Sequence, residues 1–254
     1  MRSFFVIGLV LFLITSCKEL IDKENGEHFN VDEQLYSTAT ITDGKIQSPI
    51  NILTTNAAEG NDHQINILCG DGIKVETVAN TGHSVQLNFE SGNTIVFDDK
   101  RYDMIQAHFH TPSEHQVDGL TFPMEMHFVN KLLTNSEQDS SAYLVIALLI
   151  KMGEENTFIK KFIGHIPTEE NQTILKTNAP AWEKEWLLDE VDQTLHYYYY
   201  QGSLTTPPYT ETVNWLVSKK IFEASPEQIQ YINDLEGNNA RHVHALFNRT
   251  IETN

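Results

Sequence analysis

From about residue 46 onward, apolar and polar positions alternate in short runs separated by turn residues. Alternation of this kind predicts strands with one buried face, because successive side chains of a strand point to opposite sides. We expect such strands over 84–89, 94–97 and 104–110. Residues 143–150 instead form a continuous apolar run, which is typical of a strand buried on both faces.

Positions with helical periodicity are sparse. Short stretches over 157–162 and 226–235 fit peripheral helices, and Ser225 is placed to cap the second one. The chain shows no internal repeat and no second linker. The pattern therefore predicts one mostly β domain, with a central sheet and a few short peripheral helices.

The N-terminal segment differs from the rest of the chain. After Arg2, residues 4–14 form an apolar run that is too short to cross a bilayer as a helix but fits a secretory signal sequence. The following Ile14-Thr15-Ser16-Cys17 resembles the bacterial lipobox. We predict that residues 1–16 are a lipoprotein signal peptide and that Cys17 receives the lipid. A plain signal peptide with an incidental cysteine is the alternative.

Three regions follow from this prediction. After the signal peptide, residues 17–45 are polar and acidic without sustained periodicity, which is typical of a tether. Residues 46–254 form the globular domain. The mature protein is then expected to be exported and anchored by its lipid to a bacterial membrane, on the periplasmic side or at the cell surface.

Composition narrows the possible partners. The chain has 17 basic and 35 acidic residues, and its formal net charge of -18 argues against nucleic-acid binding, which requires a basic surface. A hydrophobic share of 40% is enough to build a core. Once Cys17 is lipidated, Cys69 is left without a partner for an internal disulfide. We expect it to be a small buried residue, with a reactive thiol as the alternative.

Three of the eleven histidines suggest a metal site. His108 and His110 are separated by one residue, so both imidazoles project from the same face of a strand. His127 lies in a second alternating run, and a loop over 111–123 would allow the two strands to pair antiparallel. Three neutral nitrogens with one open position are the composition of a catalytic zinc site. Histidines that share a strand face without binding metal are the alternative.

The neighbouring residues favour the metal site. Gln106 precedes His108 by two residues, and Glu125 precedes His127 by two, so each shares a strand face with its histidine. From these positions an amide or a carboxylate can accept the second ring N–H and select the tautomer. Glu114 follows in a segment interrupted by a proline.

Five blocks of sequence, in this order, resemble the α-class carbonic anhydrases, from about residue 46 to the C-terminus. They are Gln47-Ser48-Pro49-Ile50, Asn80-Thr81-Gly82-His83, residues 106–115, residues 124–129, and residues 202–208 with the following Val213-Asn214-Trp215. The resemblance implies a single domain around a large, mainly antiparallel twisted sheet. It also implies a zinc-dependent lyase that hydrates CO₂ reversibly to bicarbonate and a proton, by attack of zinc-bound hydroxide.

The resemblance also assigns the metal ligands. His108, His110 and His127 would bind Zn²⁺. Gln106 and Glu125 would accept hydrogen bonds from the ligand rings. Zinc-bound water loses a proton near pH 7, a value established for carbonic anhydrases themselves, and so supplies a nucleophile at neutral pH.

The resemblance assigns four further residues to the reaction. Thr205 would accept a hydrogen bond from the hydroxide and donate its own proton to Glu114, because an ionised carboxylate can only accept. Thr206 would position the bicarbonate that forms. His83 would shuttle the proton to solvent, since its ordinary pKa lies close to that of the zinc water. An ordinary turn histidine is the alternative for His83.

An apolar wall would hold CO₂, a substrate without a net dipole. The resemblance assigns it to four residues that would otherwise be routine core residues: Val129, Val145, Leu204 and Trp215.

Some features depart from the family. The upstream aromatic block is not recognisable and Tyr36 is a poor substitute, while Gln86 stands where a pocket asparagine is common. The remaining histidines are expected to be surface or structural residues: His28, His63, His115, His165, His196, His242 and His244.

Two other functions use the same residues. The spacing of His108, His110 and Glu114 also occurs in cupins, where the glutamate is itself a ligand and the metal is iron or manganese. The glycines that a cupin requires are missing, because Gly119 is displaced by one position and residues 122–124 contain none. A carbonic-anhydrase-like binding protein without activity is the other alternative. Such proteins typically lack a zinc histidine, and none is missing here.

Overall fold

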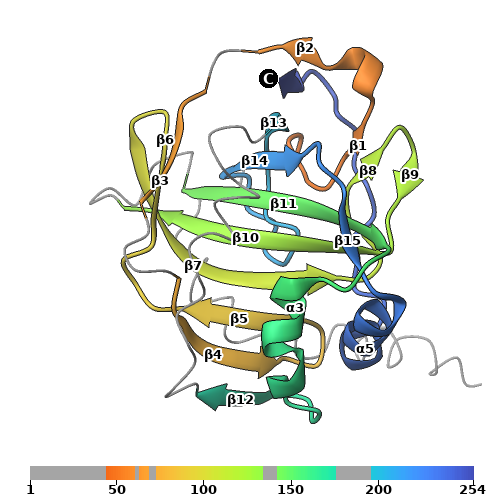
Figure 1. Cartoon of the computed structure of the whole chain (residues 1–254). Helices are drawn as coiled ribbons and strands as arrows, with labels where there is room; N and C mark the ends of the chain where they lie inside the picture. The colour runs from red at the N-terminus through yellow and green to blue at the C-terminus, as the bar shows by residue number, and fades with distance from the viewer. Residues whose placement is uncertain (1–43, 61–62, 69–72, 134–141, 176–195) are drawn as a thin grey trace, which may run out of the picture. The chain divides into compact units, whose positions relative to one another are not determined.

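Figure 1 shows a computed structural model of the chain, which describes residues 44–60, 63–68, 73–133, 142–175 and 196–254. These residues form two sheets, one of 13 strands and one of three. The strands are β1 (Asn51–Ile52), β2 (Ala58–Glu59), β3 (Ile65–Leu68), β4 (Val75–Asn80), β5 (Val85–Phe89), β6 (Thr94–Phe97), β7 (Lys100–His110), β8 (Gln116–Val117), β9 (Leu120–Thr121), β10 (Met124–Leu132), β11 (Tyr143–Met152), β12 (Gln172–Leu175), β13 (Tyr197–Gly202), β14 (Val213–Ser218), β15 (Phe222–Ala224) and β16 (Glu252–Thr253). The helices are α3 (Thr157–Phe162) and α5 (Pro226–Glu236), with 3₁₀ turns at Thr54–Asn56 and Ile163–His165.

The large sheet has the strand order β12-β4-β5-β7-β10-β11-β14-β13-β16-β2, and β3, β6 and β15 pair off this path (Figure 1). Most neighbours are antiparallel, but β11 runs parallel to β14 and β15, and β16 runs parallel to β2. The prediction of a mostly β domain around a large, mainly antiparallel sheet with short peripheral helices is confirmed. Within the described residues, no helix has the length and apolar character that a bilayer crossing requires.

The predicted elements lie where the pattern placed them, with one exception. At α5, the Ser225 hydroxyl accepts a hydrogen bond from the Gln228 backbone, and the Gln228 side chain accepts one in return. The exception is the segment 111–123, expected to be a loop, in which β8 and β9 form a hairpin that pairs with β1. Asp118 and Gly119 both have positive φ, which is the conformation that a tight two-residue hairpin requires.

A β-bulge in β7 decides which side chains face the site. Gln106 pairs with Val129 on β10 whereas Met104 pairs with Asn130, so Ile105 is an extra residue without a partner there. Before the bulge Tyr102 and Met104 face the core; beyond it Ala107 and Phe109 do. The bulge therefore turns the even-numbered residues of the strand end, Gln106, His108 and His110, to the opposite face.

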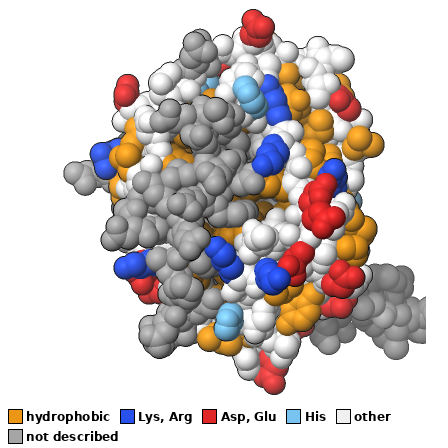
Figure 2. All heavy atoms as spheres, in the orientation of Figure 1, with side chains coloured by type: hydrophobic (Ala, Val, Ile, Leu, Met, Phe, Trp, Pro, Cys, Tyr) orange, Lys and Arg blue, Asp and Glu red, His pale blue; other side chains and the backbone are white. Residues whose placement is uncertain are grey.

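The main hydrophobic core lies between this sheet and the helices. Phe162 on α3 contacts Phe109 on β7 with ring centroids 5.7 Å apart, and Phe158 contacts Phe128 on β10 at 6.2 Å. Strand β11 is buried on both faces, as its continuous apolar run predicts. On the face of the molecule in Figure 2, basic, acidic and apolar side chains are interspersed.

Three predictions lie outside the described residues. These are the signal peptide over 1–16, the lipidated Cys17 with nearly all of the tether over 17–45, and the buried position of Cys69.

Candidate active site

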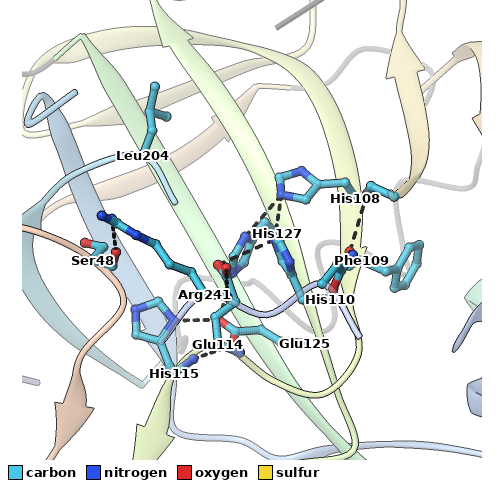
Figure 3. A network of polar contacts seen from close by, with 12 residues as sticks. Ser48, His108, Phe109, His110, Glu114, His115, Glu125, His127, Leu204 and Arg241 are labelled. Atoms are coloured by element: carbon cyan, nitrogen blue, oxygen red, sulfur yellow. Dashed lines mark hydrogen bonds and ion pairs between the residues drawn. The ribbon is translucent and has the colours of Figure 1, made fainter. Parts of the chain in front are cut away.

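Three histidines on two neighbouring strands point at one another (Figure 3). His127 on β10 lies directly opposite His108 on β7, and His110 follows two residues along the same face. His108 Nε2 is 3.1 Å from His110 Nε2 and 3.3 Å from His127 Nδ1. His110 and His127 are buried. The antiparallel pairing expected from the pattern is confirmed, and it brings the three imidazoles together.

Hydrogen bonds on the outer side of two rings select their tautomers. His108 Nδ1 lies 2.8 Å from Gln106 Oε1, and His127 Nε2 lies 2.8 Å from Glu125 Oε1. Because both oxygens are acceptors, these ring nitrogens carry the protons. The facing nitrogens, His108 Nε2 and His127 Nδ1, are then both unprotonated. Two lone pairs 3.3 Å apart repel each other unless a cation or a proton lies between them.

Burial keeps the three rings neutral. It is the largest cause of a His108 pKa well below the usual 6.5, and His110 and His127 lower it further. Burial also lowers the pKa of His110 to about 4 and lowers that of His127, although Glu125 raises both. Neutral imidazole is the form that binds metal. At pH 7 a metal ion would therefore compete with few protons for these ring nitrogens.

The donor set fits a zinc ion. Nitrogens that bind Zn²⁺ at about 2.0–2.1 Å with tetrahedral angles lie about 3.3–3.4 Å from one another, close to the 3.1 and 3.3 Å observed. Among the described residues, the acidic and histidine groupings tight enough to hold a metal are this triad and a second set, His115, Glu125 and His127. In the second set the ring nitrogens already donate to Glu125. Glu114 belongs to neither, which does not favour the cupin-like ligand set.

Glu125 is a fully buried carboxylate that accepts four hydrogen bonds. Its Oε2 accepts from the backbone N–H groups of Glu114 and His115, both at 2.8 Å, and its Oε1 accepts from the rings of His115 and His127. Burial alone would raise the Glu125 pKa, but His115 and His127 lower it well below its usual value. The ionised side chain therefore holds the His127 ring rigidly.

The Glu114 carboxylate lies beside the triad. Its Oε1 accepts from the Arg241 backbone N–H at 3.0 Å, while its Oε2 is 3.5 Å from His110 Nε2. Burial raises the Glu114 pKa to about 7, against a lowering by His127 and smaller ones by Arg241 and Thr205. Thr205 is thus close enough to act on the carboxylate, but Oε2 has no hydrogen-bond partner of normal geometry among the described residues.

A buried network behind the triad supports Glu125. His115 Nε2 lies 2.6 Å from the Tyr200 hydroxyl, which donates to Ser48 Oγ at 2.9 Å. Ser48 Oγ also accepts from the Ser203 backbone N–H at 3.1 Å. Glycine is required at position 202, because a Cβ there would lie 2.1 Å from Ser48 Oγ. His115, expected to be surface or structural, is a buried structural residue.

Three of the four side chains expected to form the apolar wall lie in one row across the sheet. Val129 on β10 is directly opposite Val145 on β11, which is directly opposite Trp215 on β14. The Trp215 ring also contacts the His127 ring, with centroids 4.9 Å apart. Leu204 is buried on the loop that follows β13 and is 4% exposed. The strand register thus places the row beside the ligand rings.

His83 is exposed in the turn before β5. Gly82 has a φ of 83°. The Asn80 side chain accepts a hydrogen bond from the Gly82 N–H, and this bond holds the turn. Further along β5, Gln86 lies directly opposite His108. His83 precedes Gln86 by three residues and lies in the turn before the strand.

Two residues of the segment after α5 contact the site and were missed by the sequence analysis. The Asn239 side chain donates to the carbonyls of His83 at 2.7 Å and Phe109 at 3.2 Å. Asn239 also raises the His110 pKa through hydrogen bonding, although His110 Nδ1 has no partner of normal geometry in the described residues. The other missed residue is Arg241, the donor to Glu114. Neither stands in a motif, so only the tertiary contact reveals them.

A family model described as eukaryotic-type carbonic anhydrase matches residues 32–254. The chain belongs to the carbonic anhydrase family. The carbonic anhydrase of Pectobacterium atrosepticum is 36% identical over 209 residues, which are 82% of this chain and 80% of that protein. The carbonic anhydrase of Neisseria gonorrhoeae is 37% identical over 191 residues, or 75% of this chain and 68% of that one.

Solved carbonic anhydrases share the fold as well. The α-carbonic anhydrase of Thermovibrio ammonificans, solved with the inhibitor sulfanilamide, has a TM-score of 0.72 at 33% identity over 82% of this chain and 87% of its own. The α-carbonic anhydrase of Photobacterium profundum has a TM-score of 0.69 at 31% identity over 87% and 95%. Reversible hydration of CO₂ is the general activity of the carbonic anhydrase family, whose α-type members use zinc.

Proposed function

We propose that this carbonic anhydrase hydrates CO₂ at a zinc ion held by His108 Nε2, His110 Nε2 and His127 Nδ1. The observation that carries the proposal is the 3.3 Å separation of His108 Nε2 and His127 Nδ1, in rings whose outer nitrogens lie 2.8 Å from oxygens of Gln106 and Glu125, so that the facing nitrogens are assigned as unprotonated. Such a pair is stabilised by a cation between its lone pairs. Three protein ligands leave the fourth position of a tetrahedral zinc open for water.

When bound, zinc lowers the pKa of a water molecule to about 7 and so supplies a nucleophile at neutral pH, as is established for carbonic anhydrases themselves. The chain's own residues orient the reactants. Ionised Glu114 accepts only, so it directs the Thr205 hydroxyl proton toward itself and leaves the Thr205 oxygen as an acceptor toward the nucleophile. Thr206 positions the product bicarbonate. An apolar surface excludes water from the position that CO₂ would occupy. It consists of the row of Val129, Val145 and Trp215 together with Leu204 on its loop.

One measurement on a single sample tests the proposal. Purified protein is expected to contain one zinc per chain after dialysis and to hydrate CO₂ in a stopped-flow assay. Removal of zinc with a chelator should abolish hydration, and added zinc should restore it. Full zinc content without hydration would instead support the inactive binding protein. Another tightly bound metal would contradict the zinc assignment.

We further propose that His83 carries the proton out of the site. An acid with a pKa near 7 releases protons directly to water at no more than about 10³ s⁻¹, because the reverse reaction is limited by diffusion. Turnover near 10⁶ s⁻¹, the value established for carbonic anhydrase, therefore needs an intermediate carrier. His83 is exposed, and histidine is the side chain whose unperturbed pKa, about 6.5, lies closest to that of the zinc water; both support this role.

His83→Ala is expected to reduce kcat in weak buffer toward about 10³ s⁻¹, with zinc content and kcat/KM unchanged. Millimolar imidazole should restore much of the rate, since it carries protons in solution. His165→Ala, which removes another exposed histidine, is the control and should have no effect. An unchanged kcat in weak buffer would rule out His83 as the carrier.

We also propose that the chain is a lipoprotein anchored through Cys17 on the exported side of a bacterial membrane. The lipobox-like sequence directly after an apolar segment supports the proposal. Cys17→Ser is expected to move the protein from the membrane fraction to the soluble fraction, because stable anchoring requires acyl chains. Cys69→Ser, which changes the other cysteine, should stay with the membranes. If the Cys17 variant also stays there, the anchor is wrong.

A further inference from the structure

Arg241 contacts Glu114 directly and also contacts Tyr209, which lies on the loop that carries Thr205; its contacts with Glu114 and Ser48 are drawn in Figure 3. Its backbone N–H donates to Glu114 Oε1 at 3.0 Å. Its guanidinium lies 3.7 Å from the centre of the Tyr209 ring and donates through Nη1 to the Ser48 carbonyl at 2.6 Å. The backbone of this one residue therefore holds the carboxylate, and its side chain holds the loop that carries the threonine.

Tyr209 closes the loop around Thr205 and Thr206. Its N–H donates to the Thr206 carbonyl at 2.9 Å, and the Leu204 N–H donates across the loop to Thr210 at 2.9 Å. Tyr209 has a φ of 59°, in the left-handed region that a tyrosine rarely occupies. Such a conformation persists when tertiary contacts hold the residue, and the guanidinium on the Tyr209 ring is a contact of this kind.

The Gln47 side chain also holds this loop, since it donates to the Tyr209 carbonyl at 3.1 Å. Glu114 Oε2 accepts no hydrogen bond of normal geometry from the described residues, so its approach to Thr205 depends on where the carboxylate and the loop are held. A guanidinium suits this task better than an ammonium, because its planar fork can stack on a ring and donate within its plane. Arg241 has both contacts at once.

We infer that Arg241 is a positioning residue, which sets the alignment of Thr205 with Glu114 by clamping the Tyr209 ring. The inference rests on the proposed function for its effect on catalysis, but the clamp itself is a property of the chain. It acts through Tyr209 and Glu114.

Removal of the clamp should slow the hydration step without loss of zinc. Arg241→Met is expected to lower kcat/KM about 10- to 100-fold, since a displacement of about 1 Å in a positioned group has effects of this size. Imidazole should not restore the rate, which distinguishes the loss from a proton-transfer defect. Arg241→Lys keeps the charge and should lose nearly as much. Tyr209→Phe keeps the ring face and should retain more activity than Tyr209→Leu.

A double-mutant cycle separates positioning from general destabilisation. With Thr205→Ala already present, Arg241→Met should reduce kcat/KM by less than about twofold, because the group that it aligns is gone. Full additivity of the two losses would overturn the inference, and so would a wild-type kcat/KM in Arg241→Met.

Hydrogen exchange on metal-free protein tests the clamp without any activity. In Arg241→Met the amides of Leu204 and Tyr209 should exchange about tenfold faster than in the wild type. The control is Arg249→Met, which removes a second half-buried arginine whose hydrogen bonds go to the carbonyls of Gln201, Ala245 and Leu246. It should leave the exchange of both amides unchanged. Unchanged amide exchange in Arg241→Met would overturn the clamp. If the wild-type protein does not hydrate CO₂, that result would count against the proposed function alone.

Discussion

His127→Ala is expected to abolish measurable CO₂ hydration and to release most of the bound zinc. Loss of an outer hydrogen-bond partner already costs metal sites about 10–100-fold in affinity or activity, so loss of a ligand should cost more than about 10²-fold. The same change leaves Glu125, a fully buried carboxylate, without one of its four donors. Loss of one hydrogen bond to this buried charged group should add a stability loss of about 1.5–3 kcal/mol.

Zinc per chain after dialysis, hydration rate and melting temperature of the same preparation check this result. Gln106→Ala is the graded comparison, because it removes only the outer partner of His108 and should weaken zinc binding without abolishing it. His165→Ala, at an exposed histidine, should change none of the three quantities. Full zinc occupancy with full activity in His127→Ala would sink the ligand assignment.

Thr205→Ala and Glu114→Gln are each expected to retain zinc and to lose about 10²–10³-fold in hydration rate, the usual effect of one oriented hydrogen bond in an active site. Thr205→Ala removes the hydroxyl. Glu114→Gln keeps the shape of the side chain but introduces an amide that can donate and so reverse the hydrogen bond. Without metal the Glu114 pKa is about 7, and a dication beside its Oε2 would lower it and favour the carboxylate.

Metal analysis and stopped-flow hydration on both variants separate the alternatives. Thr205→Ser keeps the hydroxyl and should recover most of the rate lost in Thr205→Ala. If Glu114→Gln loses its metal, Glu114 is itself a ligand, as in the cupin-like alternative. Unimpaired hydration in Thr205→Ala would falsify the proposed pair of hydrogen bonds that runs from the nucleophile to Thr205 and from Thr205 to Glu114.

The sequence determined those features of the site that depend on spacing within one strand. Side chains two residues apart share a strand face, so His-x-His and the pairs Gln106–His108 and Glu125–His127 could be predicted from the period of two alone. In the structure both outer pairs are 2.8 Å hydrogen bonds. The doubly buried β11 and the Ser225 cap were likewise predictable, since each depends on a few consecutive residues.

The register that brings His127 opposite His108 was decided by tertiary structure. The two strands are joined by 13 residues, 111–123, and no local signal specifies which residues of one strand pair with which residues of the other. The bulge at Ile105 has a trace in the sequence, because the apolar positions change there from Tyr102 and Met104 to Ala107 and Phe109. Only the pairing of β7 with β10 shows that this change is a bulge and which side chains it turns toward the site.

The contacts from the end of the chain were also decided by tertiary structure alone. Arg241 reaches Glu114, and Asn239 reaches His83 and Phe109, across more than 120 positions of sequence. A polar residue in a loop shows no periodicity, so nothing in its neighbours tells whether it faces solvent or a buried carboxylate. The sequence by itself determined which residues can do the chemistry, because that depends on residue type and strand period. Packing between distant segments decided how those residues are held.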